Sequence, residues 1–197
     1  DRLTRGRCFK ARQLFRQTQS LCQDTIFKLV NNKVDQLMAL ALDINWAPTH
    51  TPPRDAPHPY TGDLVAYLNT TFESLRFMPP PVRDKVPMAC CARIAELWLA
   101  LLSKKPSSES KFNLVGVCNL ERDLTALEAF AEDQPVAQLV RAFQDVRRLI
   151  SLVLYGEIEG VVKVKRIDDP LVGGLLVKLV DILPNYQPLR RSSEVAT

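Results

Sequence analysis

Glycine, histidine and aromatic residues are scarce in this sequence of 197 residues, and cysteine occurs in an odd number. There are seven glycines, two histidines and five cysteines, and 7% of the residues are aromatic. An odd cysteine count rules out a complete set of internal disulfides, and the lack of a Cys-x-x-Cys pair argues against a zinc site. No Gly-rich loop suited to phosphate groups is present. We therefore expect no cofactor, no metal and no catalytic activity.

Long apolar runs and an initiator methionine are also missing. No uninterrupted apolar run approaches the ~20 residues that span a bilayer, and no signal peptide stands at the start. We expect the chain to be a fragment of a longer protein. Its apolar share of 46% is typical of a globular protein with a sizeable core.

Charge is concentrated at one end of the chain. Residues 1–34 hold eight cations and two carboxylates, a net charge of +6, while the whole chain carries +4. Such a basic arm suits an acidic partner, an anionic lipid surface or RNA, and it equally suits the solvated face of a helix. Because aromatic residues are not interleaved with these charges, we expect no binding to nucleic acid and keep a membrane surface as a candidate partner.

The first 46 residues predict one long helix that continues from a missing upstream region. We expect it to run from about residue 8 to 44, longer than about 50 Å at 1.5 Å per residue, which favours an elongated rod. The prolines of residues 47–59 predict an exposed linker after it. The apolar positions that define the helix recur at spacings of three, four and seven: Leu14, Leu21, Ile26, Leu29, Leu37, Leu40 and Ile44.

Residues 60–183 predict a helical bundle. A second helix is expected from Thr61 as N-cap, and a third over 82–103, with Pro87 marking a start or a kink. A fourth and a fifth fall within 112–154 and are separated at Glu132–Pro135, with Pro135 in the first turn of the fifth. A sixth is expected from Asp168 or Asp169 to residue 183, and residues 184–197 as a flexible tail. The apolar stripes of the fourth and fifth are Leu120, Leu124, Leu127, Phe130, Leu139, Phe143, Val146, Ile150 and Val153.

The fold class is therefore all-α, an elongated helical bundle or rod. Four segments, in order and spacing, resemble the C-terminal region of the exocyst subunit Sec15, also called exocyst complex component 6. The Trp-x-Pro helix end and the Asp-Val-Arg-Arg-Leu string carry most of the resemblance, which covers roughly residues 26–183. The segments are Lys33-Val34-Asp35-Gln36-Leu37 with Asn45-Trp46-Ala47-Pro48; Tyr60, Asp63-Leu64, Tyr67-Leu68, Phe72, Leu75 and Pro79; Asn119-Leu120, Asp123-Leu124, Leu127-Glu128 and Phe130-Ala131; and Ala142-Phe143-Gln144-Asp145-Val146-Arg147-Arg148-Leu149 with Leu152.

The resemblance implies a rod-like module, with no catalytic residues and no cofactor, of the complex that tethers secretory vesicles to the plasma membrane. It implies other exocyst subunits and a GTP-loaded Rab GTPase as partners, and a cytoplasmic location at vesicle and plasma membrane. Two alternatives stay open. The chain could be a structural rod between subunits without Rab binding, or a peripheral membrane module that uses its basic first helix.

The candidate partner surface rests partly on this resemblance and partly on chemistry. We expect exposed polar positions of the last three helices to carry it, namely Asn119, Glu121 and Asp123 with Arg148. A few desolvated polar contacts would dominate the energy of such an interface. Of the adjacent Arg147 and Arg148, one is expected to pair with a carboxylate on a neighbouring helix and the other to be solvated. The segment from Lys163 to Arg166 is the fallback site.

Overall fold

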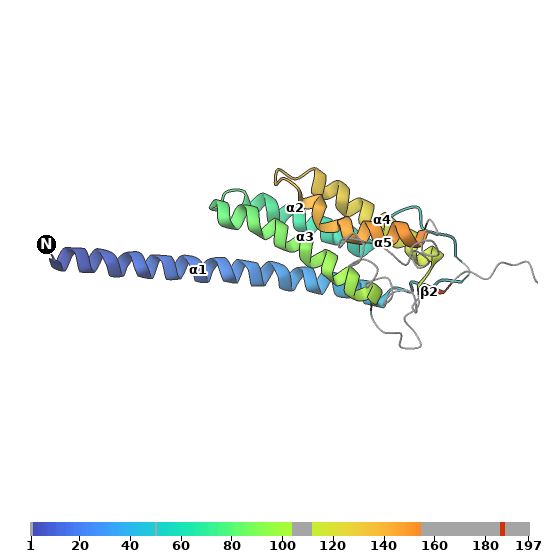
Figure 1. The fold of residues 1–197 in the computed structure, drawn as a ribbon, viewed down its shortest axis with the longest axis horizontal. Helices are drawn as coiled ribbons and strands as arrows, with labels where there is room; N and C mark the ends of the chain where they lie inside the picture. The colour runs from blue at the N-terminus through green and yellow to red at the C-terminus, as the bar shows by residue number, and fades with distance from the viewer. Residues whose placement is uncertain (1, 50, 104–111, 155–185, 188–197) are drawn as a thin grey trace, which may run out of the picture.

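The described part of the chain is almost entirely helical. The computed structural model describes residues 2–49, 51–103, 112–154 and 186–187, and within these ranges it has five α-helices and two short 3-10 helices. The prediction of an all-α fold is confirmed. Figure 1 shows α2, α3, α4 and α5 lying side by side along the C-terminal part of α1, which extends well beyond them.

Helix α1 spans Arg2–Ala39 and continues as the 3-10 helix η1, Leu40–Asp43. Its 38 residues correspond to about 57 Å at 1.5 Å per residue. The side chains that enter the core recur at spacings of four, four and three, as expected for one face of a helix. They are Val30, Val34, Met38 and Ala41.

The spacing of apolar residues predicted the helix correctly, but many of these residues lie outside the core. Leu14, Leu21, Leu29 and Leu40 are exposed, whereas Ile26, Leu37 and Ile44 are partly buried against the core. The reason is that α1 carries apolar residues on two faces, and only one of these faces meets the bundle. Spacing alone does not say which face is covered.

Helix α2 spans Pro59–Leu75 and begins two residues before the predicted start. Pro59 takes the first helical position, where its missing N–H costs nothing, and His58 precedes it in an extended conformation. Thr61 is therefore not the N-cap but a buried residue of the first turn. The face of α2 that lies in the core is made of Tyr60, Leu64, Leu68, Phe72 and Leu75.

Helix α3 spans Pro80–Ser103 and lies at the centre of the bundle, against α1, α2, η2 and α5. Pro87 lies inside it and is buried. By length and composition alone α3 could cross a membrane, although it has no continuous apolar run. Its apolar character is accounted for by packing, because many of its apolar side chains are buried in the core, including Cys90, Cys91, Ile94 and Trp98.

Helix α4 spans Leu114–Glu132, and its predicted stripe is fully in the core. The side-chain oxygen of Asn113 accepts a hydrogen bond of 2.9 Å from Gly116 N, which caps the helix. Gly116 packs against the backbone after η1, since a Cβ there would lie 1.8 Å from the carbonyl oxygen of Trp46. The first turn of α4 therefore requires glycine at this position.

The fifth helix begins later than predicted. Gln138 has a left-handed φ of 71°, the 3-10 helix η2 follows at Leu139–Phe143, and α5 spans Gln144–Leu154. Pro135 thus lies in the turn after α4 rather than in the first turn of a helix. Within the described part of the stripe, Leu139, Phe143, Val146 and Ile150 are all buried, as predicted.

A two-residue strand, β1 at Phe112–Asn113, pairs in parallel with β2 at Tyr186–Gln187. Two residues of the segment expected to be a tail thus have a defined partner next to the start of α4. The predicted sixth helix, the Ser-rich loop after Ser103 and the fallback site from Lys163 to Arg166 lie outside the described residues.

Candidate functional site

The segment 47–59 lies against one flank of α4 and is held there by two polar side chains. The backbone N–H of Arg54 donates to Asn119 Oδ1 at 2.7 Å, and the N–H of His58 donates to Asp123 Oδ1 at 2.6 Å. A third amide, Asn113 Nδ2, donates to the carbonyl oxygen of Pro48 at 2.7 Å. These bonds supply partners to an irregular backbone that has no ladder of its own.

Asp123 is the centre of a buried polar network. His58 Nδ1 donates to Asp123 Oδ2 at 2.8 Å, and the hydroxyl of Tyr60 donates to the same oxygen at 3.0 Å. Trp98 Nε1 in turn donates to the Tyr60 oxygen at 3.2 Å. Burial, reinforced by the Asp123 carboxylate, raises the pKa of Tyr60 above its ordinary value. The phenol therefore stays neutral and keeps its proton for Asp123.

Asn119 and Asp123 were predicted to be exposed positions that contact a partner. The prediction of exposure is wrong. Their exposed fractions are 6% and 0%. Both side chains accept hydrogen bonds from the backbone of the segment 47–59. This segment is not the wholly exposed linker that was predicted, since His58 is buried. They form the scaffold beneath a surface, not the surface itself.

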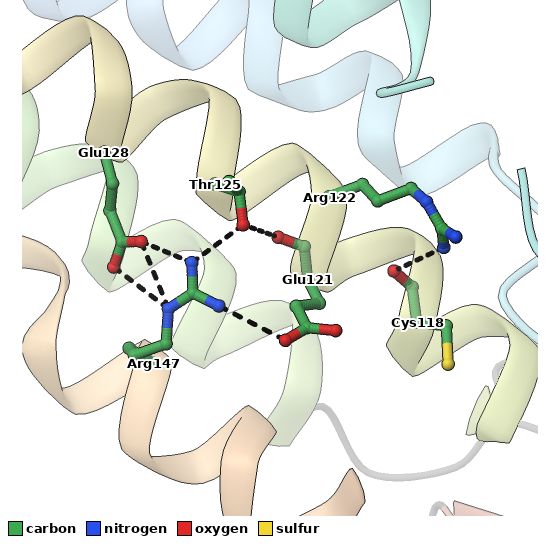
Figure 2. Close-up of polar contacts among 6 residues, drawn as sticks. All are labelled: Cys118, Glu121, Arg122, Thr125, Glu128 and Arg147. Carbon is green, nitrogen blue, oxygen red and sulfur yellow. Dashed lines mark hydrogen bonds and ion pairs between the residues drawn. The ribbon is translucent and has the colours of Figure 1, made fainter. Parts of the chain in front are cut away.

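The other flank of α4 faces α5 and carries a charged cluster. Arg147 Nε lies 3.1 and 3.2 Å from the carboxylate oxygens of Glu128, and its Nη2 also contacts Glu128. Arg147 Nη2 donates to Thr125 Oγ1 at 2.9 Å, and Nη1 lies 3.5 Å from Glu121 Oε1. Figure 2 shows the guanidinium of Arg147 between these side chains. Arg147 is thus the paired arginine of the two, and Arg148 is exposed, as predicted.

Arg122 points away from this cluster (Figure 2). Its Nη1 donates to the carbonyl oxygen of Cys118 at 3.3 Å, one turn earlier on the same helix. Among the residues that the structure describes, no carboxylate forms an ion pair with Arg122. Its charge is therefore only partly satisfied within the described fold.

An open groove of about 540 Å³ runs between α4 and the segment 47–59. Its lining combines small apolar side chains with a few polar ones, a mixture that is common in protein interfaces. The lining residues are Pro53, Pro57, Cys118, Glu121, Arg122, Thr125, Ala126 and Ala129. We name this surface the α4 groove.

The predicted site residues do not form one surface. Glu121 lines the α4 groove, whereas Asn119 and Asp123 are two residues before and after it and so lie about 160° away around the helix. Arg148 is on α5, next to the Arg147 cluster. Sequence reasoning missed Arg122 and Thr125. A helical projection of 118–129 would have found them, because they lie opposite the buried stripe.

The buried thiols of α3 are held in their protonated form. Burial raises the pKa of Cys90 and of Cys91 to about 12, so both are protonated at neutral pH. Across the described ranges, no three side chains of His, Cys, Asp or Glu lie close enough to hold a metal ion.

Comparison with known proteins identifies the family. Residues 5–163 match the family model described as exocyst complex subunit Sec15 C-terminal. The chain is similar to exocyst complex component 6B of Mus musculus, 27% identical over 145 residues, which are 71% of this chain and 17% of the relative. It is also similar to exocyst complex component SEC15B of Arabidopsis thaliana, 23% identical over 146 residues, 70% of this chain and 18% of that protein.

A third relative covers more of the chain. Exocyst complex component 6 of Dictyostelium discoideum is 23% identical over 188 residues, which are 90% of this chain and 18% of the relative. The chain spans less than a fifth of the length of these relatives. No solved structure matches it. The resemblance drawn from the four sequence segments is confirmed, and the chain belongs to the Sec15 C-terminal family of exocyst complex subunits.

Proposed function

We propose that this chain is a non-catalytic vesicle-tethering module and that its α4 groove binds a Rab GTPase in the GTP form. Family membership supports the tethering role. The observation that carries the binding site is the α4 groove itself, an open surface with a half-exposed, unpaired Arg122 above a rigid buried scaffold. The module would act on the cytoplasmic side of vesicle and plasma membrane, together with other exocyst subunits.

The chemistry of the α4 groove suits a GTPase switch surface. Such a surface offers apolar and charged groups together, and only a few desolvated polar contacts determine the energy of the interface. Ala126 and Ala129 supply small apolar contacts, and Glu121, Arg122 and Thr125 supply charge and hydrogen bonds. Because the γ-phosphate orders the switch segments, binding should require GTP.

The scaffold beneath the α4 groove is already in place before a partner arrives. Asn119 and Asp123 fix the segment 47–59 through backbone hydrogen bonds of 2.7 and 2.6 Å. The groove therefore has two rigid walls, and little ordering entropy is lost on binding. This arrangement favours a binding surface over a passive connection between helices.

The proposal is tested by pull-down and calorimetry with a panel of Rab GTPases loaded with a non-hydrolysable GTP analogue or with GDP. Arg122→Glu should weaken binding of the GTP form by about 2 kcal/mol or more and leave the melting temperature unchanged. Glu132→Lys is the matched control, since Glu132 is an exposed charge of the same helix outside the α4 groove. Unchanged binding by a folded Arg122→Glu variant would move the site elsewhere, to residues 163–166 first.

Nucleotide dependence separates the proposal from its main alternative. Equal binding of GDP and GTP forms, or no binding to any Rab, would reject the effector role. It would promote a structural role between exocyst subunits, without Rab binding. Arg148→Glu is a second variant for the same assay, because Arg148 is exposed beside the charged cluster and its reversal leaves the Arg147 contacts intact.

A further inference from the structure

The N-terminal half of α1 has no tertiary partner among the described residues. Every side chain from Phe9 to Leu21 is exposed, and α1 runs clear of the bundle over this stretch (Figure 1). Large apolar side chains are among them, with exposed fractions of 64% for Leu14, 72% for Phe15 and 67% for Leu21. An isolated helix in water is marginal, and most helices are held by packing of an apolar face.

These apolar residues form one continuous stripe. It contains no charged residue over about five turns, and its members recur at spacings of three and four, as in a coiled-coil seam. At about 100° per residue, the stripe lies about 150° around the axis from the face that packs on the bundle. Its members are Ala11, Leu14, Phe15, Thr18, Leu21, Cys22, Thr25 and Leu29.

The two threonines in the stripe do not break it. Thr25 Oγ1 donates to the carbonyl oxygen of Leu21 at 2.8 Å, so its hydroxyl is already bonded within the helix.

The residues of the stripe repeat at intervals of seven, since Leu14 is followed by Leu21, and Phe15 by Cys22 and Leu29. A seven-residue repeat is the spacing that a second helix matches.

Charge decides which kind of helix can dock. Residues 9–29 carry Lys10, Arg12, Arg16 and Lys28 against Asp24 alone. A second copy of this chain laid along the stripe would place like charges beside one another, which is unfavourable. Lys10 and Lys28 lie about 80° from the centre of the stripe on one side, and Arg12 lies about 120° from it on the other. A helix rich in glutamate or aspartate beside its apolar seam would meet these cations with complementary charge.

We propose that residues 9–29 of α1 are a docking surface for an acidic amphipathic helix, which packs on the stripe as a two-helix coiled coil. A membrane is the less suitable occupant. The stripe is narrow and includes two threonines, while a helix that lies in a bilayer interface has a large, bulky apolar face. This surface is separate from the α4 groove, so its loss should not alter binding of a GTPase there.

The probe is a fluorescent four-heptad peptide with leucine at positions a and d and glutamate at e and g, and a second peptide with lysine in place of glutamate. Fluorescence anisotropy should show binding of the acidic peptide and at least tenfold weaker binding of the basic one. The double variant Leu14→Glu with Leu21→Glu should weaken binding at least tenfold.

The control is Gln13→Glu with Ser20→Glu, which adds the same charge at the same seven-residue spacing to exposed positions on the opposite face of α1. It should change binding by less than about threefold, because the remaining effect is long-range and screened by salt. Circular dichroism checks that both doubles keep the helix content of the parent chain.

Four results would overturn the proposal. They are no binding of the acidic peptide, equal binding of the acidic and basic peptides, equal loss in the two double variants, and a stripe occupied by another partner. Light scattering would reveal a second copy of the chain on the stripe, as self-association that is lost in the double variant Leu14→Glu with Leu21→Glu. Flotation with phosphatidylcholine vesicles that contain phosphatidylserine would reveal a membrane on the stripe, as vesicle binding that is lost in the same double variant.

Discussion

The two flanks of α4 carry similar polar residues, yet one flank is scaffold and the other is surface. Asn119 and Asp123 are buried and accept hydrogen bonds from the segment 47–59. Glu121 and Arg122, one to three residues away, line an open groove. The difference lies in the contacts, because the backbone N–H groups of the segment 47–59 need acceptors, and Asn119 and Asp123 supply them. Glu121 instead contacts Arg147 of α5, and Arg122 contacts the backbone of its own helix.

The two flanks of α4 should contribute differently to the free energy of unfolding. Removing a buried acceptor leaves donors without a partner and costs the full desolvation penalty of each. Removing a surface charge costs little stability, since exposed ion pairs contribute only about 0–1 kcal/mol. Variants of the buried flank should therefore destabilise the module, and variants of the open flank should change binding alone.

The largest effect is expected at Leu149, next to the exposed Arg148. Leu149 is 1% exposed, so Leu149→Asp would bury an unpaired carboxylate in the core of α5. The cost should be about 4 kcal/mol or more, comparable to the stability of a domain, and the variant should unfold or aggregate. Arg148→Asp, one residue away, should melt within a few degrees of the parent in a thermal scan. Equal melting of the two variants would show that the buried face of α5 is wrongly placed.

Asp123→Ala should cost about 3 kcal/mol, because it leaves the His58 backbone N–H, the His58 ring N–H and the Tyr60 hydroxyl without an acceptor. Urea denaturation measures this free energy of unfolding. Glu121→Ala is the matched truncation on the other flank and should cost less than about 1 kcal/mol. If both cost the same, the distinction between scaffold and surface fails.

The buried flank should also weaken at alkaline pH. The pKa of Tyr60 is raised in the folded chain from its ordinary value of 10.0, so above that pH the unfolded chain loses a proton that the folded chain keeps. The free energy of unfolding should therefore fall as pH rises past 10, by about 1.4 kcal/mol per pH unit from this group. Cys90 and Cys91, raised to about 12, add a fall of the same sign that begins nearer 9. Tyr60→Phe should make the slope above pH 10 shallower in urea titrations, and an unchanged slope would contradict this reading.

The helices were predictable from sequence because their core stripes are periodic. The stripes from Leu120 to Phe130 and from Leu139 to Ile150 are in the core as predicted. Helix starts were less predictable, since they depend on tertiary contacts. Thr61 has the chemistry of an N-cap but is buried in the first turn of α2, and Pro135 lies in a turn that ends at the left-handed Gln138.

The site was predictable only in part, for two physical reasons. The spacing of two residues between Asn119, Glu121 and Asp123 already places Glu121 on a different face from the other two. What the sequence does not contain is the path of the segment 47–59, which decides that Asn119 and Asp123 face protein. In α1, likewise, two apolar faces are visible in sequence, and only the fold shows that the one with Leu14 and Leu21 is exposed within the described part of the chain.

The smallest predicted effect concerns the charged cluster around Arg147, because its ion pair is intermediate in burial between the two flanks. Arg147 and Glu128 are partly buried, with 29% and 18% of their side chains exposed, and the pair is bidentate. Such geometry should place the pair at the upper end of surface ion pairs, about 1 kcal/mol, and below the cost of Asp123→Ala. A double-mutant cycle with Arg147→Met and Glu128→Gln isolates this coupling from the loss of packing by the arginine stem. Added salt should reduce it only slightly, because the pair is shielded from solvent on the side of α5. A coupling near 3 kcal/mol would mean that the side of α4 that faces α5 is also a structural contact, and that Arg148 beside it is a poor candidate for a partner contact.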